Sequence, residues 1–160
     1  MVRMGVDPGA WISAVAVVRV EREEAEILHA EMVPNELLSS RVADLVEAHG
    51  VEEAVIERPS KGPWKRGVSK EHLKVLKAVG DEVEKVLEER GVSVKRPLPS
   101  RADAWYGEGS PGWRQRLTGL LRPSEEDVRA VLRGLARRKA LKGPVPRTKH
   151  LVDAVGMTLV

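Results

Sequence analysis

Apolar and polar residues alternate along the first seven positions of the chain with the two-residue period of a β-strand. This strand spans residues 2–7 and ends at Asp7, because Pro8-Gly9 turns the chain directly afterwards. Two more extended runs, rich in β-branched residues, follow at residues 11–20 and 24–33 and are separated by a charged break. The pattern predicts three antiparallel strands joined by short turns.

Between residues 34 and 99 the apolar period alternates between that of a helix and that of a strand. Helical spacing predicts a helix at residues 36–49, with Asn35 as its cap, and a long helix from Ser69 to about Arg90. The uninterrupted apolar run within residues 51–57 is typical of a strand covered on both faces. A brief fifth strand at residues 92–95 is ended by two prolines.

The last third of the chain is mainly helical by its spacing. Two basic helices are predicted at residues 113–121 and 124–141, the second begun by Ser124, and a final helix follows Thr148 at residues 149–160. Three antiparallel strands followed by two strands that return through crossovers predict a mixed five-stranded sheet flanked by helices. This α/β order, with the first, fourth and fifth strands parallel, is that of the ribonuclease H-like fold.

Length and composition limit the class of protein. The chain has 160 residues, 42% of them hydrophobic, which suits one domain over residues 1–160. No apolar run approaches the roughly 18 residues of a membrane span, and no secretory signal is evident, so we expect a cytoplasmic protein. Without cysteine, a metal would be held by Asp, Glu and His, which favours magnesium or manganese. One Asn, one Gln and a 32% charged fraction form a profile associated with thermophiles.

The charges are unevenly distributed along the chain. Residues 1–90 hold 13 basic and 18 acidic side chains, whereas residues 91–160 hold 14 basic and 6 acidic ones. A basic second half is typical of a surface that faces a polyanion such as a nucleic acid. Helices that simply expose solvated basic faces would give the same count, and the charge distribution alone does not separate these two interpretations.

Three acidic residues and one histidine form a candidate site in this topology. Asp7 and Glu57 end two neighbouring strands, and His150 and Asp153 project from one face of the last helix. An ionised carboxylate in a sheet core is strongly disfavoured unless a positive charge meets it. A divalent cation suits these ligands, and two-metal nucleases use such a set to activate the attacking water and stabilise the leaving oxygen.

Each member of this set also has a purely structural interpretation. Asp7 is compatible with a turn-opening residue, and His150 with a helix-start histidine that bonds a carbonyl. Glu57 is compatible with a strand-end ion pair to Arg58, and Asp153 with an exposed helix position. Four such coincidences at these topological positions are less expected than one shared site.

Three segments resemble the RuvC-type Holliday junction resolvases. Met4-Gly-Val-Asp-Pro-Gly9 resembles the family's opening strand, Ala54-Val-Ile-Glu57 its second acidic strand, and His150-Leu-Val-Asp-Ala154 its C-terminal acidic helix. Histidine at the first position of that helix is similar to the variant of the Thermus branch. A looser similarity joins Trp105-Tyr-Gly-Glu-Gly-Ser110 and Gln115 to the family's Gly-x-Gly segment and downstream Gln. Divergence elsewhere is compatible with a bacteriophage origin as well as a bacterial one.

The resemblance implies a magnesium-dependent endodeoxyribonuclease, with two Mg2+ ions per site and Mn2+ as a substitute. Asp7 would bridge the two ions, Glu57 would bind one, and His150 with Asp153 the other. The family further implies a homodimer that binds a four-way DNA junction and nicks two symmetric strands. The apolar stripe from Leu73 to Leu87 fits the dimer interface of the family and fits a core-packing helix equally well.

The resemblance also implies residues that contact DNA. An aromatic residue after the second acidic strand wedges into the junction in this family, and Trp64 fits that position, although a core-covering tryptophan is the alternative. Base stacking on an aromatic ring typically contributes about 1–3 kcal/mol. The expected phosphate contacts are Arg58, Lys61, Lys65, Arg66, Arg101 and Arg114.

Two other functions remain compatible with the sequence. A ribonuclease H-like nuclease acting on structured RNA would use the same acidic residues. A non-catalytic nucleic-acid-binding module would keep the basic second half without requiring all four candidate ligands. A sugar-kinase-type ATPase shares the first strand motif but needs a second glycine-rich phosphate loop and a larger chain.

Overall fold

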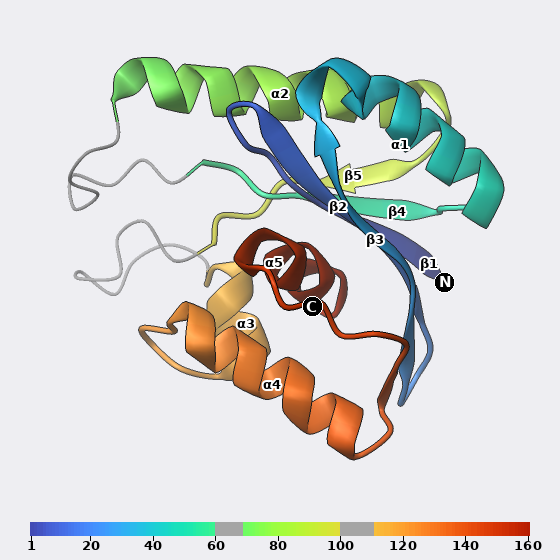
Figure 1. Ribbon diagram of the computed structural model, residues 1–160, viewed down its shortest axis with the longest axis vertical. Coiled ribbons are helices and arrows are strands. Elements are labelled where there is room, and N and C mark those ends of the chain that lie inside the picture. The colour runs from blue at the N-terminus through green and yellow to red at the C-terminus, as the bar shows by residue number, and fades with distance from the viewer. Residues whose placement is uncertain (60–68, 100–110) are drawn as a thin grey trace.

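The computed structural model describes residues 1–59, 69–99 and 111–160 and shows a single sheet with helices on both faces (Figure 1). The strands are β1 (Val2–Asp7), β2 (Ile12–Val20), β3 (Ala25–Pro34), β4 (Glu53–Ile56), β5 (Ser93–Lys95) and β6 (Leu141–Lys142). The helices are α1 (Asn35–His49), α2 (Lys70–Glu89), α3 (Trp113–Thr118), α4 (Glu125–Arg137) and α5 (Lys149–Thr158).

The sheet has the strand order β5-β4-β1-β2-β3-β6. Strand β1 pairs antiparallel with β2 and parallel with β4, and β4 in turn pairs parallel with β5. The mixed sheet and its two parallel crossovers confirm the α/β topology expected from the sequence. Because β1 and β4 run in the same direction with Val6 opposite Ile56, the residues that follow these two strands meet at one edge.

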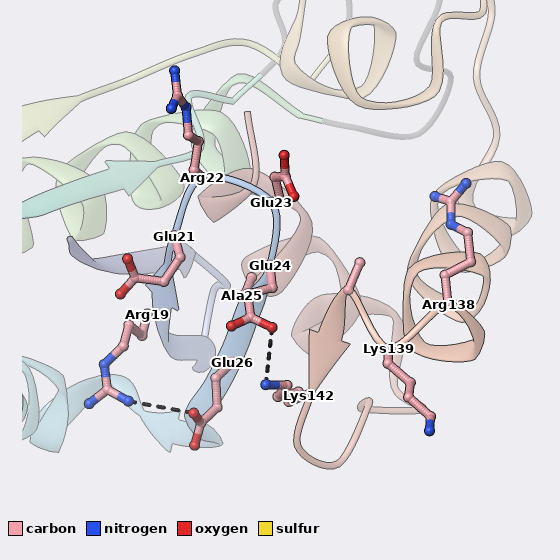
Figure 2. Close-up of a pocket in the computed structure, with 11 residues that line it drawn as sticks. Arg19, Glu21, Arg22, Glu23, Glu24, Ala25, Glu26, Arg138, Lys139 and Lys142 are labelled. Atoms are coloured by element: carbon pink, nitrogen blue, oxygen red, sulfur yellow. Dashed lines mark hydrogen bonds and ion pairs between the residues drawn. The ribbon is translucent and has the colours of Figure 1, made fainter.

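The sixth strand was not expected. Helix α4 ends at Arg137 instead of continuing to Leu141, and Lys139 has a left-handed φ of 61° between them. Leu141 and Lys142 then pair parallel with Ala25 and Glu26 at the start of β3. Figure 2 shows this corner, where the Lys142 ammonium lies 3.0 Å from the Glu24 carboxylate. Burial of Leu141 against the sheet favours the strand over another helical turn.

Alternating side chains of the strands feed two hydrophobic cores. Met4 and Val6 point to the face covered by α1 and α2, and Val15 and Val17 lie in the same core. Ala16, with its alternating neighbours on β2, points to the opposite face, which α3, α4 and α5 cover (Figure 1). Both cores use the two-residue period of the strands, which explains why the central strands read as nearly continuous apolar runs.

Helix α5 lies directly on β1. A side chain at Gly5 would collide with the backbone carbonyl of Ala154, so this position needs glycine for the helix to approach the strand. Arg3 adds a hydrogen bond of 3.0 Å from Nη1 to the carbonyl of Thr158 at the other end of the helix. This close packing brings the N-terminal turn of α5 to the C-terminal end of β1.

The helix starts agree with the sequence in part. The Ser69 hydroxyl accepts a hydrogen bond from the His72 amide, and Ser124 forms a capping box with Asp127, which confirms both caps. Thr148 stands at the N-cap of α5 without a side-chain cap bond. Asn35 does not cap α1: it is the first helical residue, and its amide donates to the Gly9 carbonyl at 2.8 Å. Its side chain therefore fixes the turn after Asp7.

Helix α2 is amphipathic and only part of its apolar stripe is covered. Val83 and Leu87 are buried in the core between the sheet and α1. Leu73 and Leu76 lie outside both cores, and Val75 is 43% exposed. The core-packing interpretation is therefore confirmed for the second half of the helix, and the homodimer stays a prediction. In the described ranges, no helix has the length and apolarity needed to cross a membrane.

Candidate functional site

Asp7 lies at the C-terminal end of β1 and is only 6% exposed. Its Oδ2 atom lies 2.7 Å from Nδ1 of His150, the second residue of α5. The imidazole is about half exposed, because the helix start carries it to the rim of the site. The side chain that meets Asp7 is therefore His150, from the opposite end of the chain.

Glu57 follows β4 directly and reaches the same edge of the sheet. Its amide donates to the carbonyl of Val6 at 3.1 Å, which continues the pairing of the two parallel strands. Its carboxylate accepts a 2.7 Å hydrogen bond from the indole nitrogen of Trp113. Trp113 is fully buried, so the hydrogen bond reaches Glu57 from the protein interior and not from the solvent side.

Asp153 projects from α5 one turn after His150 and is 1% exposed. Its Oδ2 atom accepts a 2.6 Å hydrogen bond from Nη2 of Arg114. The guanidinium lies 5.3 Å from the ring centre of Trp113, within the range of a cation–π contact. Helix α3 therefore supplies both a neutral donor and a cation to the carboxylates.

Burial and like charge shift the pKa values of the group. Burial, together with the nearby charge of Asp7, raises the pKa of Glu57 to about 7. Burial also raises the pKa of Asp153, although Arg114 opposes the shift. The hydrogen bond to Asp7 raises the pKa of His150. The carboxylates thus interact with one another, and the positive charge of Arg114 does not fully balance their negative charge.

The donor set suits a hard divalent cation, and the present contacts are not those of a formed metal site. Carboxylate oxygens and one imidazole nitrogen are ligands of such ions, and the raised pKa of Glu57 shows that more positive charge would be stabilising. Within residues 1–59, 69–99 and 111–160, however, no three His, Asp or Glu side chains could hold one ion together. Binding would require Asp7 and Asp153 to exchange His150 and Arg114 for the cation.

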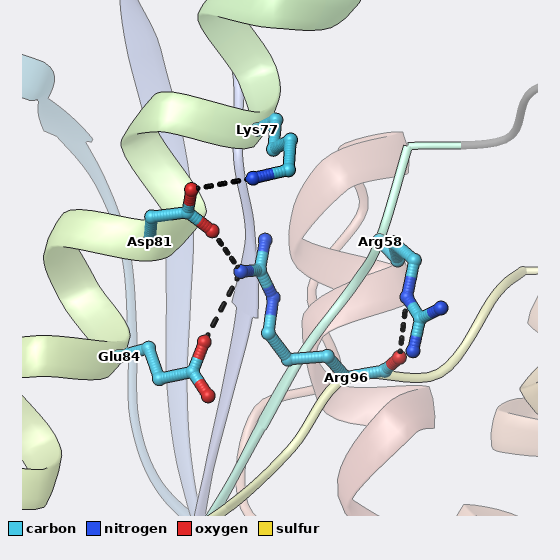
Figure 3. Close-up of polar contacts among 5 residues, drawn as sticks. All are labelled: Arg58, Lys77, Asp81, Glu84 and Arg96. Atoms are coloured by element: carbon cyan, nitrogen blue, oxygen red, sulfur yellow. Dashed lines mark hydrogen bonds and ion pairs between the residues drawn. The ribbon is translucent and has the colours of Figure 1, made fainter.

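The loop after Glu57 is anchored to α2 through Arg96 (Figure 3). Nε of Arg58 donates to the carbonyl of Arg96 at 3.1 Å, so Arg58 does not pair with Glu57. The Arg96 guanidinium in turn contacts the carboxylates of Asp81 and Glu84. This network holds Arg58 and the residues after β5 against the long helix α2.

The predicted DNA contacts are placed only in part. Arg58 is exposed and directly follows Glu57. Arg114, predicted to contact phosphate, instead turns inward to Asp153. The remaining predicted contacts and the proposed wedge lie outside the described residues, as does the Trp105–Ser110 segment; these are Lys61, Trp64, Lys65, Arg66 and Arg101.

The structure adds Trp113 to the site, a residue that sequence reasoning did not single out. Its fully buried indole N–H needs an acceptor, and Glu57 provides one. The chain has no Phe, one Tyr and four Trp, so aromatic side chains are scarce. The pair Trp113-Arg114, in which an indole N–H donor precedes a cation, is the sequence feature that could have pointed to this residue. Gln115 is structural: its side-chain oxygen accepts from the Gly112 amide at 2.8 Å, and its side-chain nitrogen donates to the Leu121 carbonyl at 2.9 Å.

Comparison with solved structures identifies this architecture as the ribonuclease H-like fold of Holliday junction resolvases. Thermus thermophilus RuvC in complex with a Holliday junction substrate superposes with a TM-score of 0.75 at 24% identity, over 98% of this chain and 90% of that one. The yeast mitochondrial resolvase Ydc2 gives 0.57 at 12% identity over 97% and 75%. The fowlpox virus resolvase gives 0.54 at 11% identity over 99% and 94%.

These likenesses cover nearly the whole chain and confirm the fold that the sequence predicted. No protein-family model and no curated protein sequence matches the chain. At identities below 25% the likeness establishes architecture, and the function has to be argued from the side chains themselves.

Proposed function

We propose that the protein is a divalent-metal-dependent endodeoxyribonuclease that resolves four-way DNA junctions by paired, symmetric nicks. The observation that carries this proposal is the meeting of Asp7, Glu57 and Asp153, from two strand ends and one helix, within mutual electrostatic reach. The same fold is present in Thermus thermophilus RuvC, whose structure includes a Holliday junction substrate. A basic second half of the chain supplies the charge that a DNA partner requires.

Asp7, Glu57, His150 and Asp153 are the residues that would hold the metal. When bound, magnesium, as two ions or with manganese in its place, lowers the pKa of the attacking water and stabilises the leaving oxygen. The proposal requires His150 to be neutral for ligation, and its hydrogen bond to Asp7 raises its pKa. We therefore expect cleavage to weaken as the pH falls and the imidazole becomes protonated.

The chain's own residues orient this set. Trp113 fixes one oxygen of Glu57 and leaves the other free, because the indole donates a single hydrogen bond. Arg114 holds Asp153 while the site contains no other cation. The packing of α5 on Gly5 keeps His150 and Asp153 at the end of β1. These contacts set the spacing of the acidic groups before a substrate arrives.

A non-catalytic nucleic-acid-binding module is the second candidate. It is favoured by the contacts of Arg114 with Asp153 and of His150 with Asp7, which satisfy both aspartates without a metal. A ribonuclease acting on structured RNA would share the proposed catalytic residues. Both alternatives give distinct outcomes in one assay.

The test is incubation of the chain with a synthetic four-way junction, a matched duplex and a structured RNA, with magnesium and with a chelator. We expect metal-dependent paired nicks confined to the junction. Asp7→Asn should abolish cleavage while junction binding is kept. Asp44→Asn, the same change at an exposed position of α1, is the matched control and should remain active. Binding without cleavage in either metal condition would favour the module, and cleavage of RNA alone the ribonuclease.

A further inference from the structure

A hollow of about 310 Å³ is lined by residues of α4, of the segment that leads into α5 and of α5 itself. Its rim is basic, and part of its floor is apolar. The lining residues are Arg129, Leu132, Arg133, Val145, Pro146, Arg147 and Val152. None of the residues assigned to the site or to DNA contact above belongs to this set.

Three arginines converge on the hollow with little acid to balance them. Arg129 and Arg133 stand one turn apart on α4, and Arg147 faces them from the other wall. Arg129 pairs with the exposed Glu126 at 3.0 Å, yet its Nε atom is buried without a hydrogen-bond partner. The side chains of Arg133 and Arg147 make no ion pair with any residue that the structure describes.

Repulsion among these arginines destabilises the unliganded protein and favours the binding of a polyanion. Positive charges at i and i+4 on a helix repel one another, and the third arginine adds to this repulsion. Buried Leu132 and Val152 in the floor provide no acceptor for the guanidinium groups. Guanidinium groups match phosphate oxygens in geometry and stay charged at any physiological pH. A ligand with several phosphates would relieve the repulsion and satisfy the free donors.

The hollow and the candidate site both draw residues from α5 and the segment before it. Val152 in its floor directly precedes Asp153, and Arg147 lies three residues before His150. At a rise of about 1.5 Å per residue, Val152 and Asp153 lie at nearly the same height on the helix. Glu125, the first residue of α4, pairs with Lys149 of α5 at 2.7 Å. A nucleic-acid strand positioned at Asp7 and Asp153 could thus pass Glu125 without meeting an unpaired carboxylate at that residue.

We propose that the groove formed by Arg129, Arg133 and Arg147 binds the phosphate backbone of a duplex arm of the DNA substrate. This inference rests on the proposed function, because it takes the substrate to be DNA. The groove fixes the arm that leaves the cleavage site and has no role in the chemical step. Its contacts are with phosphates, so it contributes affinity and register without reading sequence.

The salt dependence of DNA binding tests this proposal. The unmodified chain and R133Q/R147Q are titrated with a four-way junction and a linear duplex in chelator, at several salt concentrations. Each lost phosphate contact lowers the slope of log K against log salt by about 0.9. We expect the double variant to lower the slope by about 2 and the affinity at low salt by about ten-fold. R133K/R147K, which keeps both charges, should retain most of the slope.

R22Q/R90Q is the matched control, because it removes the same net charge from exposed arginines distant from the groove. Arg22 lies at the turn between β2 and β3 (Figure 2), and Arg90 follows α2. This control should leave the slope unchanged within about 0.3. Circular dichroism melting of each variant verifies that it is folded, since Arg133 and Arg147 are exposed and their loss should not unfold the chain.

The possible outcomes separate this inference from the proposed function. Strong DNA binding with an unchanged slope in R133Q/R147Q would overturn the groove and leave the nuclease proposal standing. Groove-dependent binding with no junction cleavage by the unmodified chain in magnesium would support the groove and overturn the nuclease. An equal loss of slope in R22Q/R90Q would show general charge attraction and overturn the groove. Failure of the unmodified chain to bind any DNA would overturn both proposals.

Discussion

At the residue scale, the carboxylates are stabilised by neighbours that the sequence did not connect with them. The positions of Asp7, Glu57 and Asp153 follow from strand ends and helix spacing, and so could be predicted. The inward turn of Arg114 depends on a rotamer, and a basic residue beside a nucleic-acid site reads equally well as a phosphate contact. Packing against Trp113 and the attraction of buried Asp153 decide between the two directions.

Glu57 should make the protein less stable as the pH rises. Its pKa is raised to about 7 in the folded state, against an ordinary value of 4.5, so the folded state binds more protons between these values. The contribution of Glu57 to the free energy of unfolding is therefore complete below about pH 4.5 and is lost as the pH rises through about 7. Glu57→Gln removes this titration, and we expect it to be more stable than the unmodified chain by about 2 kcal/mol at pH 8 in chelator.

Urea unfolding at pH 4.5 and pH 8 measures the difference between the Gln variant and the unmodified chain. Subtracting the two removes the titration of groups that do not interact with Glu57, and the difference that remains reports Glu57 together with its coupling to Asp7 and Asp153. Glu53→Gln, on the same strand, is the control, because Glu53 lies near Arg3 and Lys95 rather than the carboxylates. Equal stability of E57Q and the unmodified chain at both pH values would contradict the proposed charge repulsion.

Arg114 should be needed for stability only while Asp153 is ionised. Arg114→Met leaves a carboxylate that is 1% exposed without its cation, a change that typically costs about 3–5 kcal/mol. We expect a loss of this order at pH 8, a smaller loss in acid, and partial recovery in R114M/D153N. Denaturant unfolding of the two single variants and the double variant gives the coupling energy. A coupling below about 0.5 kcal/mol would show that the ion pair contributes little.

At the element scale, the sequence pattern identified the elements in which apolar residues recur over several turns of a helix or several residues of a strand. It failed where pairing with a distant strand decides the local structure. The five longer strands and the last helix follow from their own residues. The helix that begins at Ser124 was expected to run as far as Leu141, but it ends at Arg137. Only the parallel pairing with Ala25 makes Leu141 part of a strand, and a two-residue strand has no period to detect.

The contact between α5 and β1 should tolerate no side chain at Gly5. An added methyl group meets the Ala154 carbonyl, which belongs to the helix backbone and cannot rotate away. We expect Gly5→Ala to cost about 3 kcal/mol or more in stability and to move His150 and Asp153 from their positions. Gly134→Ala is the control, because its Cβ would meet no atom within 4 Å. Thermal melting of both variants measures the cost, and an unaffected midpoint for G5A would contradict this packing.

At the scale of the whole molecule, the proposed paired cleavage would require two copies of the site, and we propose the exposed apolar part of α2 as the surface that joins them. Leu73 and Leu76 lie outside both cores, and Val75 is 43% exposed. The stripe continues into buried Val83, so that one helix serves the core at one end and presents apolar side chains at the other. A second copy of the chain would cover this end and place two acidic sites in one assembly.

Introducing charge on this face should separate the copies without unfolding either of them. V75K/L76K is expected to sediment as a monomer at concentrations where the unmodified chain is a dimer, because two ammonium groups per copy would have to be buried at the interface. Its junction products in magnesium should then be single nicks at independent times rather than paired nicks. Leu121→Lys, at a residue that is 63% exposed, is the control and should leave both sedimentation and nick pairing unchanged. If the unmodified chain sediments as a monomer, the paired mechanism is contradicted. If V75K/L76K is a dimer and makes paired nicks, the interface lies on another surface.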